Sequence, residues 1–160
     1  MQELVSKVGE ALKASNKMVV TAESCTGGMI AEALTSIAGS TAWFDRTYVT
    51  YSYESKQEML GVGQNTIIKQ GAVSQACVTE MAIGALQQSH AQVSIACSGI
   101  AGPGGGSPDK PVGTVWIAWA MQGREDVVSQ VFYFSGDRQS VRVQATEEAL
   151  SGVLNLLSSD

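Results

Sequence analysis

The sequence predicts an α/β protein, a three-layer α/β/α sandwich around a mixed, mostly parallel sheet. Helical and strand patterns follow one another in the order α-β-α-β-α-α-β-β-β-α, which combines crossover connections with at least one antiparallel hairpin. With 160 residues, 44% of them hydrophobic and 16% charged, the chain has the size and composition of one globular domain. It contains no internal repeat and no linker-like segment. We therefore expect residues 1–160 to fold as a single domain.

Two helix–strand units are predicted in the first third of the chain. Residues 2–15 carry an apolar stripe at helical spacing, and residues 19–22 are suited to a buried strand. A tight turn over residues 23–28 leads into a second helical stripe that ends near Gly39. Residues 44–51, FDRTYVTY, alternate in polarity and are rich in β-forming residues, so we expect a second strand there.

The middle of the chain predicts two helices in succession. Ser52 is placed to cap a short helix that stops at Gly61. The stretch from there to Gly71 shows no regular pattern and is expected to be irregular. Ser74 can then cap a longer helix that reaches about Ser89, with a hydrophobic staple across its first turn.

The last third predicts three strands and a final helix. Residues 93–97 form a short apolar strand, and residues 98–111 form a loop that is rich in glycine and holds all three prolines of the chain. A loop of this length more often binds a ligand than merely connects two strands. Residues 113–121 and 126–134 are predicted to be strands joined by a hairpin turn. A final helix, capped by Asp137, is expected to reach about residue 157.

The turn between the first strand and the second helix is the leading candidate for a functional site. It places Ser24 and Cys25 side by side before a helix N-terminus, whose unpaired amides stabilise anions. Ligands of open α/β sheets bind beyond the carboxyl ends of the strands. The amides of Cys25 and Thr26 could then form an oxyanion hole, and Cys25 is itself a candidate nucleophile. Capping of the helix by Ser24 or Thr26 is the simpler alternative.

A base for Ser24 has to come from another segment. The single histidine, His90, falls at the exposed-looking end of a helix, which argues against Ser–His and Cys–His–Asn triads. Lys56 follows Tyr48 and Tyr51, and burial would lower the pKa of this lysine toward that of a general base. A solvated lysine on a helix surface is the ordinary alternative.

Two arginines near the start of the last helix are candidates for binding an anion. Arg138 and Arg142 are four residues apart, where their positive charge opposes the helix dipole unless an anionic ligand or a carboxylate such as Asp137 offsets it. The glycines of the 98–111 loop would let backbone amides approach such a ligand. The loop matches neither a P-loop nor a dinucleotide fingerprint.

Composition limits the function classes. The net charge of −5 argues against sequence-independent binding of nucleic acid, and no apolar run is long enough to span a membrane, so we expect a cytoplasmic protein. Three cysteines and one histidine give no metal-ligand spacing, so neither a metal nor a cofactor is expected. Aromatic residues such as Trp43 and Trp119 are expected to be exposed, which would be compatible with a homodimer.

Five motifs, in order along the chain, resemble the CinA C-terminal domain family: AESCTGG, FDRTYVTYSYESK, GAVS, SGIAGPGGGSPDKPVGTVW and FSGDRQSVRVQA. The resemblance covers essentially the whole chain and implies a single CinA C-terminal-like amidohydrolase domain over residues 1–160. It also implies the three-layer α/β/α fold and the metal-free hydrolysis of nicotinamide mononucleotide to nicotinate mononucleotide and ammonia, in pyridine nucleotide recycling. A non-catalytic nucleotide-binding or regulatory domain is the alternative.

The resemblance also implies roles for particular residues. Ser24 would be the nucleophile, Lys56 the base and Tyr51 a relay or orienting hydroxyl, with Tyr48 as the other candidate for that last role. The phosphate of the substrate would bind to the glycine-rich loop with Arg142. The residues expected to contact the substrate are Cys25, Thr26, Gly27, Tyr48, Ser98, Gly99, Ile100, Ala101, Gly102 and Arg142.

Overall fold

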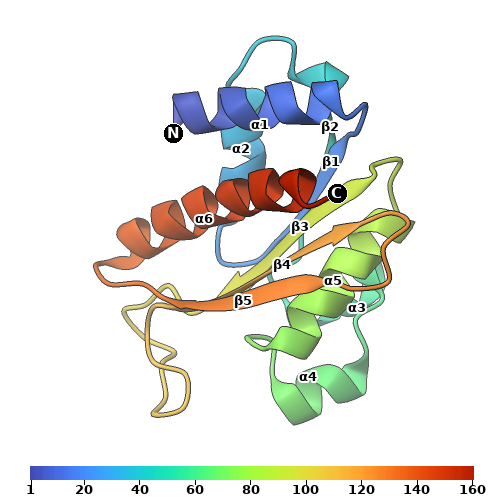
Figure 1. The fold of residues 1–160 in the computed structure, drawn as a ribbon. Helices are drawn as coiled ribbons and strands as arrows, with labels where there is room; N and C mark the ends of the chain where they lie inside the picture. The colour runs from blue at the N-terminus through green and yellow to red at the C-terminus, as the bar shows by residue number, and fades with distance from the viewer.

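The computed structural model describes residues 1–160, and a five-stranded sheet in the order β2-β1-β3-β4-β5 forms its centre (Figure 1). β1 pairs in parallel with both β2 and β3, whereas β4 pairs antiparallel with both β3 and β5. Four strands therefore share one direction, which confirms the predicted mixed, mostly parallel sheet. The strands are β1 (Val19–Glu23), β2 (Phe44–Val49), β3 (Val93–Gly99), β4 (Thr114–Met121) and β5 (Val128–Tyr133).

Six helices cover the two faces of the sheet, which confirms the three-layer sandwich (Figure 1). One face packs against α1 (Gln2–Ala14), α2 (Met29–Thr35) and α6 (Arg138–Ser158). The other face packs against α3 (Tyr53–Leu60), α4 (Gln64–Gln70) and α5 (Gln75–Gln87). Each face has its own core of apolar side chains, because strand residues alternate between the two sides of the sheet.

The parallel strands bring their carboxyl ends to one edge of the sheet. All five residues of β1 are buried, and Glu23 at its end pairs with Val49 of β2 and with Cys97 of β3. The turn after β1, the segment after β2 and the loop after β3 must therefore meet at this edge. It is the edge at which open α/β sheets bind their ligands.

The stretch before Gly71 is not irregular, as the sequence predicts, but contains helix α4. Its N-terminus is capped from another helix, because the Glu80 carboxylate accepts hydrogen bonds from the Gly63 amide at 3.3 Å and from the Thr66 hydroxyl at 2.9 Å. Only Ile67 of this helix is buried. A helix with one buried residue and a distant cap leaves no periodic pattern in its own sequence.

The second helix is shorter than expected and ends at Thr35, well before Gly39. The hydroxyl groups of Thr35 and Ser36 donate to backbone carbonyls of the preceding turn, which competes with continuation of the helix. Ile37 still packs against the core beyond the helix, and this contact explains why the apolar stripe is longer than the helix.

Trp43 and Trp119 are 3% and 4% exposed, so the expectation that they lie on the surface is wrong. The Trp119 indole N–H donates to the Ala149 carbonyl at 2.8 Å, and its ring lies directly against Gly152 of α6. The Trp43 ring fits against Gly9 of α1 in the same way. Both rings are core side chains placed opposite helical glycines, and they give no support to a homodimer.

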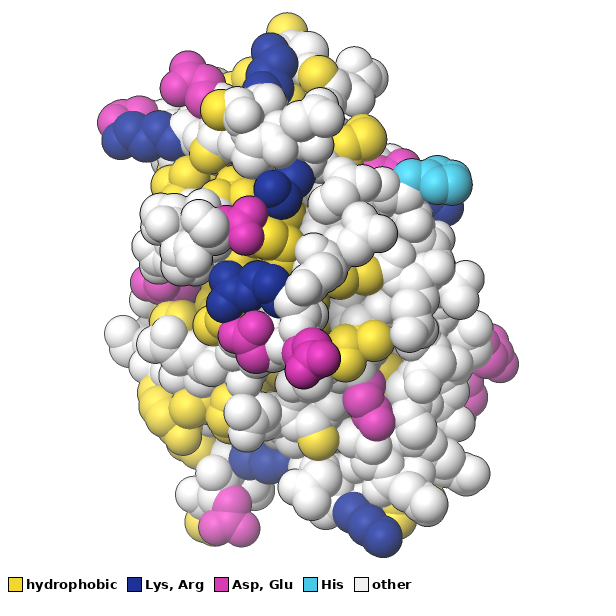
Figure 2. Space-filling view, turned by 45° about the vertical axis from the view of Figure 1, so that its right-hand side comes forward, with side chains coloured by type: hydrophobic (Ala, Val, Ile, Leu, Met, Phe, Trp, Pro, Cys, Tyr) yellow, Lys and Arg dark blue, Asp and Glu magenta, His cyan; other side chains and the backbone are white.

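The surface carries charges of both signs. Lys and Arg side chains are interspersed with Asp and Glu side chains on the face drawn in Figure 2, and no continuous basic patch covers it. None of the helices combines the length and the apolar character that crossing a bilayer requires.

Candidate active site

The turn after β1 is built around the buried side chain of Glu23. One carboxylate oxygen accepts the amides of Gly28 at 3.1 Å and Ile30 at 3.0 Å, and the other accepts the amide of Ala31 at 3.0 Å. These are orphan donors of the first turn of α2, which has no side-chain cap of its own. Glu23 thus ties the end of the strand to the start of the helix and fixes the turn that contains Ser24.

Helix α3 places the side chain of Lys56 next to this turn. The helix starts at a capping box in which the hydroxyl groups of Ser52 and Ser55 satisfy each other's backbone amides. Lys56, one turn further on, is 1% exposed, so it is not a solvated surface lysine. Its Nζ lies 2.9 Å from Ser24 Oγ and 2.6 Å from the backbone carbonyl oxygen of Thr50. The structure thus brings together the predicted nucleophile and the predicted base.

The surroundings of Lys56 shift its protonation equilibrium toward the neutral amine. None of the ion pairs in the molecule involves this lysine. Burial is the main cause that lowers the pKa of Lys56 below its usual value, and thiols nearby oppose the shift only partly. A neutral lysine in contact with Ser24 Oγ can accept the hydroxyl proton as that oxygen attacks a substrate.

Cys25 is poorly placed to serve as the nucleophile. It is 5% exposed, and a hydrogen bond to Cys97 together with burial raises the pKa of its thiol well above the ordinary value. The thiolate, which is the reactive form of cysteine, is therefore disfavoured. The amine of Lys56 makes its side-chain contact with the hydroxyl of Ser24. Geometry and protonation both favour Ser24 over Cys25.

The peptide groups after Ser24 are oriented by Arg142. Its Nε donates to the carbonyl of Cys25 at 3.0 Å, and its Nη2 donates to the carbonyl of Thr26 at 3.2 Å. The Cys25 carbonyl and the Thr26 amide belong to one planar peptide group, so fixing the first also fixes the second. The amides of Cys25 and Thr26 have no acceptor within the backbone, whereas the amide of Gly27 bonds to Ser24. Two free donors thus lie beside the serine.

A cavity of about 220 Å³ opens next to this turn. Arg138, from the first turn of α6, donates to the Gly102 carbonyl at 2.7 Å and to the Tyr51 hydroxyl at 3.0 Å. These two bonds join the segment after β2 to the loop after β3. The residues that line the cavity are Cys25, Tyr51, Gly99, Ile100, Ala101, Gly102, Gly104, Gly105 and Arg138.

Several predicted site residues do not line this cavity. Arg142 bonds to the carbonyls of the turn and does not line the cavity, so Arg138 is the arginine at the cavity. The Tyr48 hydroxyl donates to the Gln88 carbonyl at the far end of α5, which leaves Tyr51 as the tyrosine at the site. Ser98 is buried within β3. Gly27 lies in the turn with a positive φ of 57°, a conformation that glycine adopts without strain.

The role of Thr50 could not be expected from the sequence. It contributes a backbone carbonyl to Lys56, and any residue type offers the same atom. The position of Glu23 in the sequence does not define its role. It indicates only a carboxylate a few residues before a helix N-terminus, where negative charge is stabilising.

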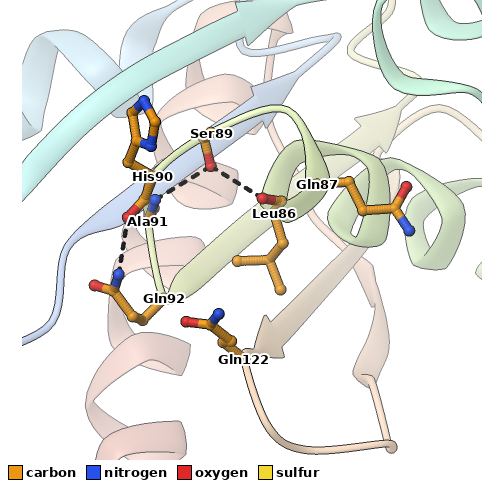
Figure 3. Close-up of a pocket in the computed structure, with 7 residues that line it drawn as sticks. All are labelled: Leu86, Gln87, Ser89, His90, Ala91, Gln92 and Gln122. Atoms are coloured by element: carbon orange, nitrogen blue, oxygen red, sulfur yellow. Dashed lines mark hydrogen bonds between the residues drawn. The ribbon is translucent and has the colours of Figure 1, made fainter.

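A second cavity, of about 430 Å³, lies at the C-terminal end of α5 (Figure 3). Ser89 and His90 both line it, but the Ser89 hydroxyl bonds to the Leu86 carbonyl and the Ala91 amide and not to the His90 ring. The ring of His90 points away from Gln92 and Gln122 in this view, and its amide donates to Asp45. The single histidine therefore has no contact with Ser24 or Cys25. No cluster of three potential metal-ligating side chains occurs in the structure.

The sheet and the contact between Ser24 and Lys56 define the class of protein: a three-layer α/β protein with a serine–lysine pair at the carboxyl ends of its parallel strands. Within this class the chain belongs to the CinA C-terminal domain family, whose model matches residues 1–157.

Relatives of known name and structure agree with this assignment. Escherichia coli K12 nicotinamide-nucleotide amidohydrolase PncC is 53% identical over 94% of this chain and 90% of its own length. The protein of the same name from Pseudomonas putida is 51% identical over 96% and 94%. The crystal structure of the competence/damage inducible protein CihA from Agrobacterium tumefaciens superposes with a TM-score of 0.93 at 44% identity, covering 97% of this chain and 94% of that one. A CinA superfamily protein from Klebsiella pneumoniae gives a TM-score of 0.95 at 41% identity, covering 99% and 98%.

Proposed function

We propose that this protein is a nicotinamide-nucleotide amidohydrolase that converts nicotinamide mononucleotide and water to nicotinate mononucleotide and ammonia, as a step of pyridine nucleotide recycling. The observation that carries the proposal is the 2.9 Å contact between Lys56 Nζ and Ser24 Oγ, in a buried setting that lowers the pKa of the amine. The names of the relatives at 51–53% identity support the choice of substrate and of reaction.

In the first half-reaction Ser24 Oγ attacks the carbonyl carbon of the carboxamide, and its proton passes to Lys56. The oxyanion that forms is held by the amides of Cys25 and Thr26, and each such donor contributes about 10²–10³ in rate. The carbon–nitrogen bond then breaks as protonated Lys56, directly or with the Tyr51 hydroxyl as a relay, gives its proton to the amide nitrogen, which leaves as ammonia. The product of this half-reaction is an ester between Ser24 and the carboxyl group of nicotinate mononucleotide.

Water completes the reaction. Lys56, again neutral, removes a proton from a water molecule that attacks the ester carbonyl, and the same two amides hold the second oxyanion. The ester bond breaks, Ser24 recovers its proton, and nicotinate mononucleotide leaves. The residues of the chain itself supply every proton transfer in this scheme.

Arg138 is the best-placed residue for the phosphate of the substrate. Of the five N–H donors of its guanidinium, one bonds to Gly102 and one to Tyr51, which leaves donors for a phosphate oxygen. The cavity of about 220 Å³ is smaller than most small-molecule sites, which enclose about 300–1,000 Å³. It would hold one end of a mononucleotide while the carboxamide lies at Ser24.

Ammonia release from nicotinamide mononucleotide tests the proposal. The parent protein and Cys25→Ala should turn the substrate over, while Ser24→Ala and Lys56→Met should be inactive. Mass spectrometry of the reaction stopped with acid should find nicotinate mononucleotide esterified to the peptide that contains Ser24. Binding of the nucleotide without turnover in the parent would instead support a regulatory, non-catalytic domain. Activity that survives in Ser24→Ala but is lost in Cys25→Ala would identify the thiol as the nucleophile.

A further inference from the structure

We propose that Glu23 is a positioning residue of this reaction, one that aligns the nucleophile turn through its carboxylate and the base through its backbone carbonyl. The inference deepens the proposed function and rests on it. Glu23 is fully buried and does not contact the cavity, so it acts through other residues and not on the substrate.

Both carboxylate oxygens of Glu23 accept hydrogen bonds from amide or hydroxyl groups. Glu23 is 0% exposed and is part of none of the ion pairs, so its charge is balanced by neutral N–H and O–H groups alone. Because the three backbone amides among its partners can only donate, the site requires a group that accepts hydrogen bonds. The donors are the amides of Gly28, Ile30 and Ala31, the hydroxyl group of Thr26, and one of the hydroxyl groups of Thr21 and Thr47, which are hydrogen-bonded to each other at 2.7 Å.

The shortest of these bonds reaches the proposed oxyanion hole. The Thr26 hydroxyl donates to Glu23 at 2.7 Å, and Thr26 carries one of the two free amides beside Ser24. Arg142 fixes the same residue from the other side through its carbonyl, at 3.2 Å. Glu23 and Arg142 therefore hold Thr26 from two directions and set the orientation of its amide.

The second link runs from Glu23 to the base. The Thr50 amide donates to the Glu23 carbonyl at 2.8 Å, and the Thr50 carbonyl accepts the Lys56 amine at 2.6 Å. This link extends the β1–β2 ladder by one residue beyond the pair of Glu23 and Val49. The residue that precedes the nucleophile thus connects by two consecutive hydrogen bonds to the amine of the base.

A purely structural role and a positioning role predict different results. If Glu23 only capped α2, its replacement would lower the free energy of unfolding and leave the chemistry of the folded fraction unchanged. If it aligns the turn, the folded variant should bind substrate normally and react slowly, because displacing a reacting group by about 1 Å can cost about 10²-fold in rate. A lower kcat with an unchanged KM in the folded variant therefore indicates the positioning role, and unchanged values of both constants indicate the structural role.

The test compares Glu23→Gln with Glu32→Gln, a matched change at an exposed carboxylate on α2. Glutamine keeps the size of the side chain but turns an N–H₂ group toward backbone donors. We expect kcat for nicotinamide mononucleotide to fall by about 10²-fold in Glu23→Gln with KM changed less than about threefold. Glu32→Gln should keep both constants. Circular dichroism and thermal unfolding establish that each variant is folded.

Two further variants cover the case in which Glu23→Gln does not fold. Thr26→Val removes one hydroxyl donor to the carboxylate, and Thr26→Ser retains it. We expect kcat to fall at least about tenfold in Thr26→Val and to stay within about threefold of the parent in Thr26→Ser. Equal kcat values for the valine and serine variants would overturn the inference.

A probe that needs no nucleotide separates this inference from the proposed function. Phenylmethylsulfonyl fluoride sulfonylates an activated serine, with fluoride as the leaving group, and mass spectrometry reports the rate at Ser24. A parent that reacts with the probe but not with nicotinamide mononucleotide overturns the proposed substrate only. A folded Glu23→Gln variant that is sulfonylated as fast as the parent overturns the positioning role. A parent inert to both reagents overturns the two proposals together.

Discussion

The side-chain nitrogen of Lys56 lies 2.9 Å from the hydroxyl oxygen of Ser24, and its other hydrogen bond, 2.6 Å long, goes to the carbonyl oxygen of Thr50. A neutral amine has two N–H bonds and one lone pair, so it can donate to Thr50 and accept from Ser24. An ammonium group could donate to both oxygens, and either form keeps one N–H without an acceptor among these contacts. The hydrogen bonds therefore accommodate both forms, and burial is what shifts the equilibrium toward the neutral lysine.

This preference makes stability depend on pH in a definite direction. Because burial lowers the pKa of folded Lys56, the unfolded chain binds the lysine proton more tightly than the folded one. Relative to Lys56→Met, which cannot titrate there, the free energy of unfolding of the parent should rise with pH. The rise should span the window between the lowered pKa and the unfolded value of about 10.4, at up to about 1.4 kcal/mol per pH unit. Urea unfolding of both proteins measures the difference, and a difference independent of pH would contradict the prediction.

The two arginines of α6 should affect different kinetic constants. Arg138 lines the cavity, so Arg138→Met should raise KM for nicotinamide mononucleotide by about tenfold or more and change KM for nicotinamide riboside, which lacks the phosphate, much less. Arg142 holds the carbonyls of Cys25 and Thr26, so Arg142→Met should lower kcat for both compounds. Steady-state ammonia release with the two substrates tests both expectations. Identical kinetic profiles for the two variants would show that the division of roles is wrong.

Thr50 carries the one buried side-chain oxygen in the structure that has no hydrogen-bond partner. Thr50→Val keeps the shape and removes this unpaired group, so it should raise the free energy of unfolding by about 1 kcal/mol or more. Thr146→Val is the matched control, because the equally buried hydroxyl of Thr146 donates to the Arg142 carbonyl at 2.9 Å and its loss should be destabilising. Urea unfolding gives both values. Destabilisation of both variants to the same extent would mean that the Thr50 hydroxyl has an unrecognised partner.

Hydrophobic periodicity was sufficient to predict the layers of the fold, because most helices and strands bury a regular face. It failed where the stabilising contact is distant in the sequence. Helix α4 depends on a cap from Glu80 of α5. Trp43 and Trp119 are buried because Gly9 and Gly152 leave room for their rings on neighbouring helices. No local pattern records either arrangement.

The catalytic pair of the site was predictable from the sequence, but the residues around it were not. Ser24 and Lys56 were identified by motif and by chemistry, and the structure places them in contact. The sequence does not predict which arginine faces the cavity. Arg138 and Arg142 lie one turn apart on the same helix, and a small rotation of that helix about its axis would change which side chain reaches the cavity. The hydrogen bond from Lys56 to Thr50 was not predictable, because its acceptor is a backbone carbonyl, which every residue has.

Close packing between α3 and α5 provides a last prediction, concerning the helix that carries Lys56. A Cβ atom at Gly84 of α5 would collide with the backbone carbonyl of Leu60, the last residue of α3. Alanine in a helix is normally more stable than glycine by about 1 kcal/mol, but a backbone atom cannot move aside, and overpacking costs about 1–3 kcal/mol. Gly84→Ala should therefore lower the free energy of unfolding, measured with urea, whereas Gly104→Ala, where the added atom meets open space, should change it little. A stabilised Gly84→Ala variant would mean that the two helices separate easily.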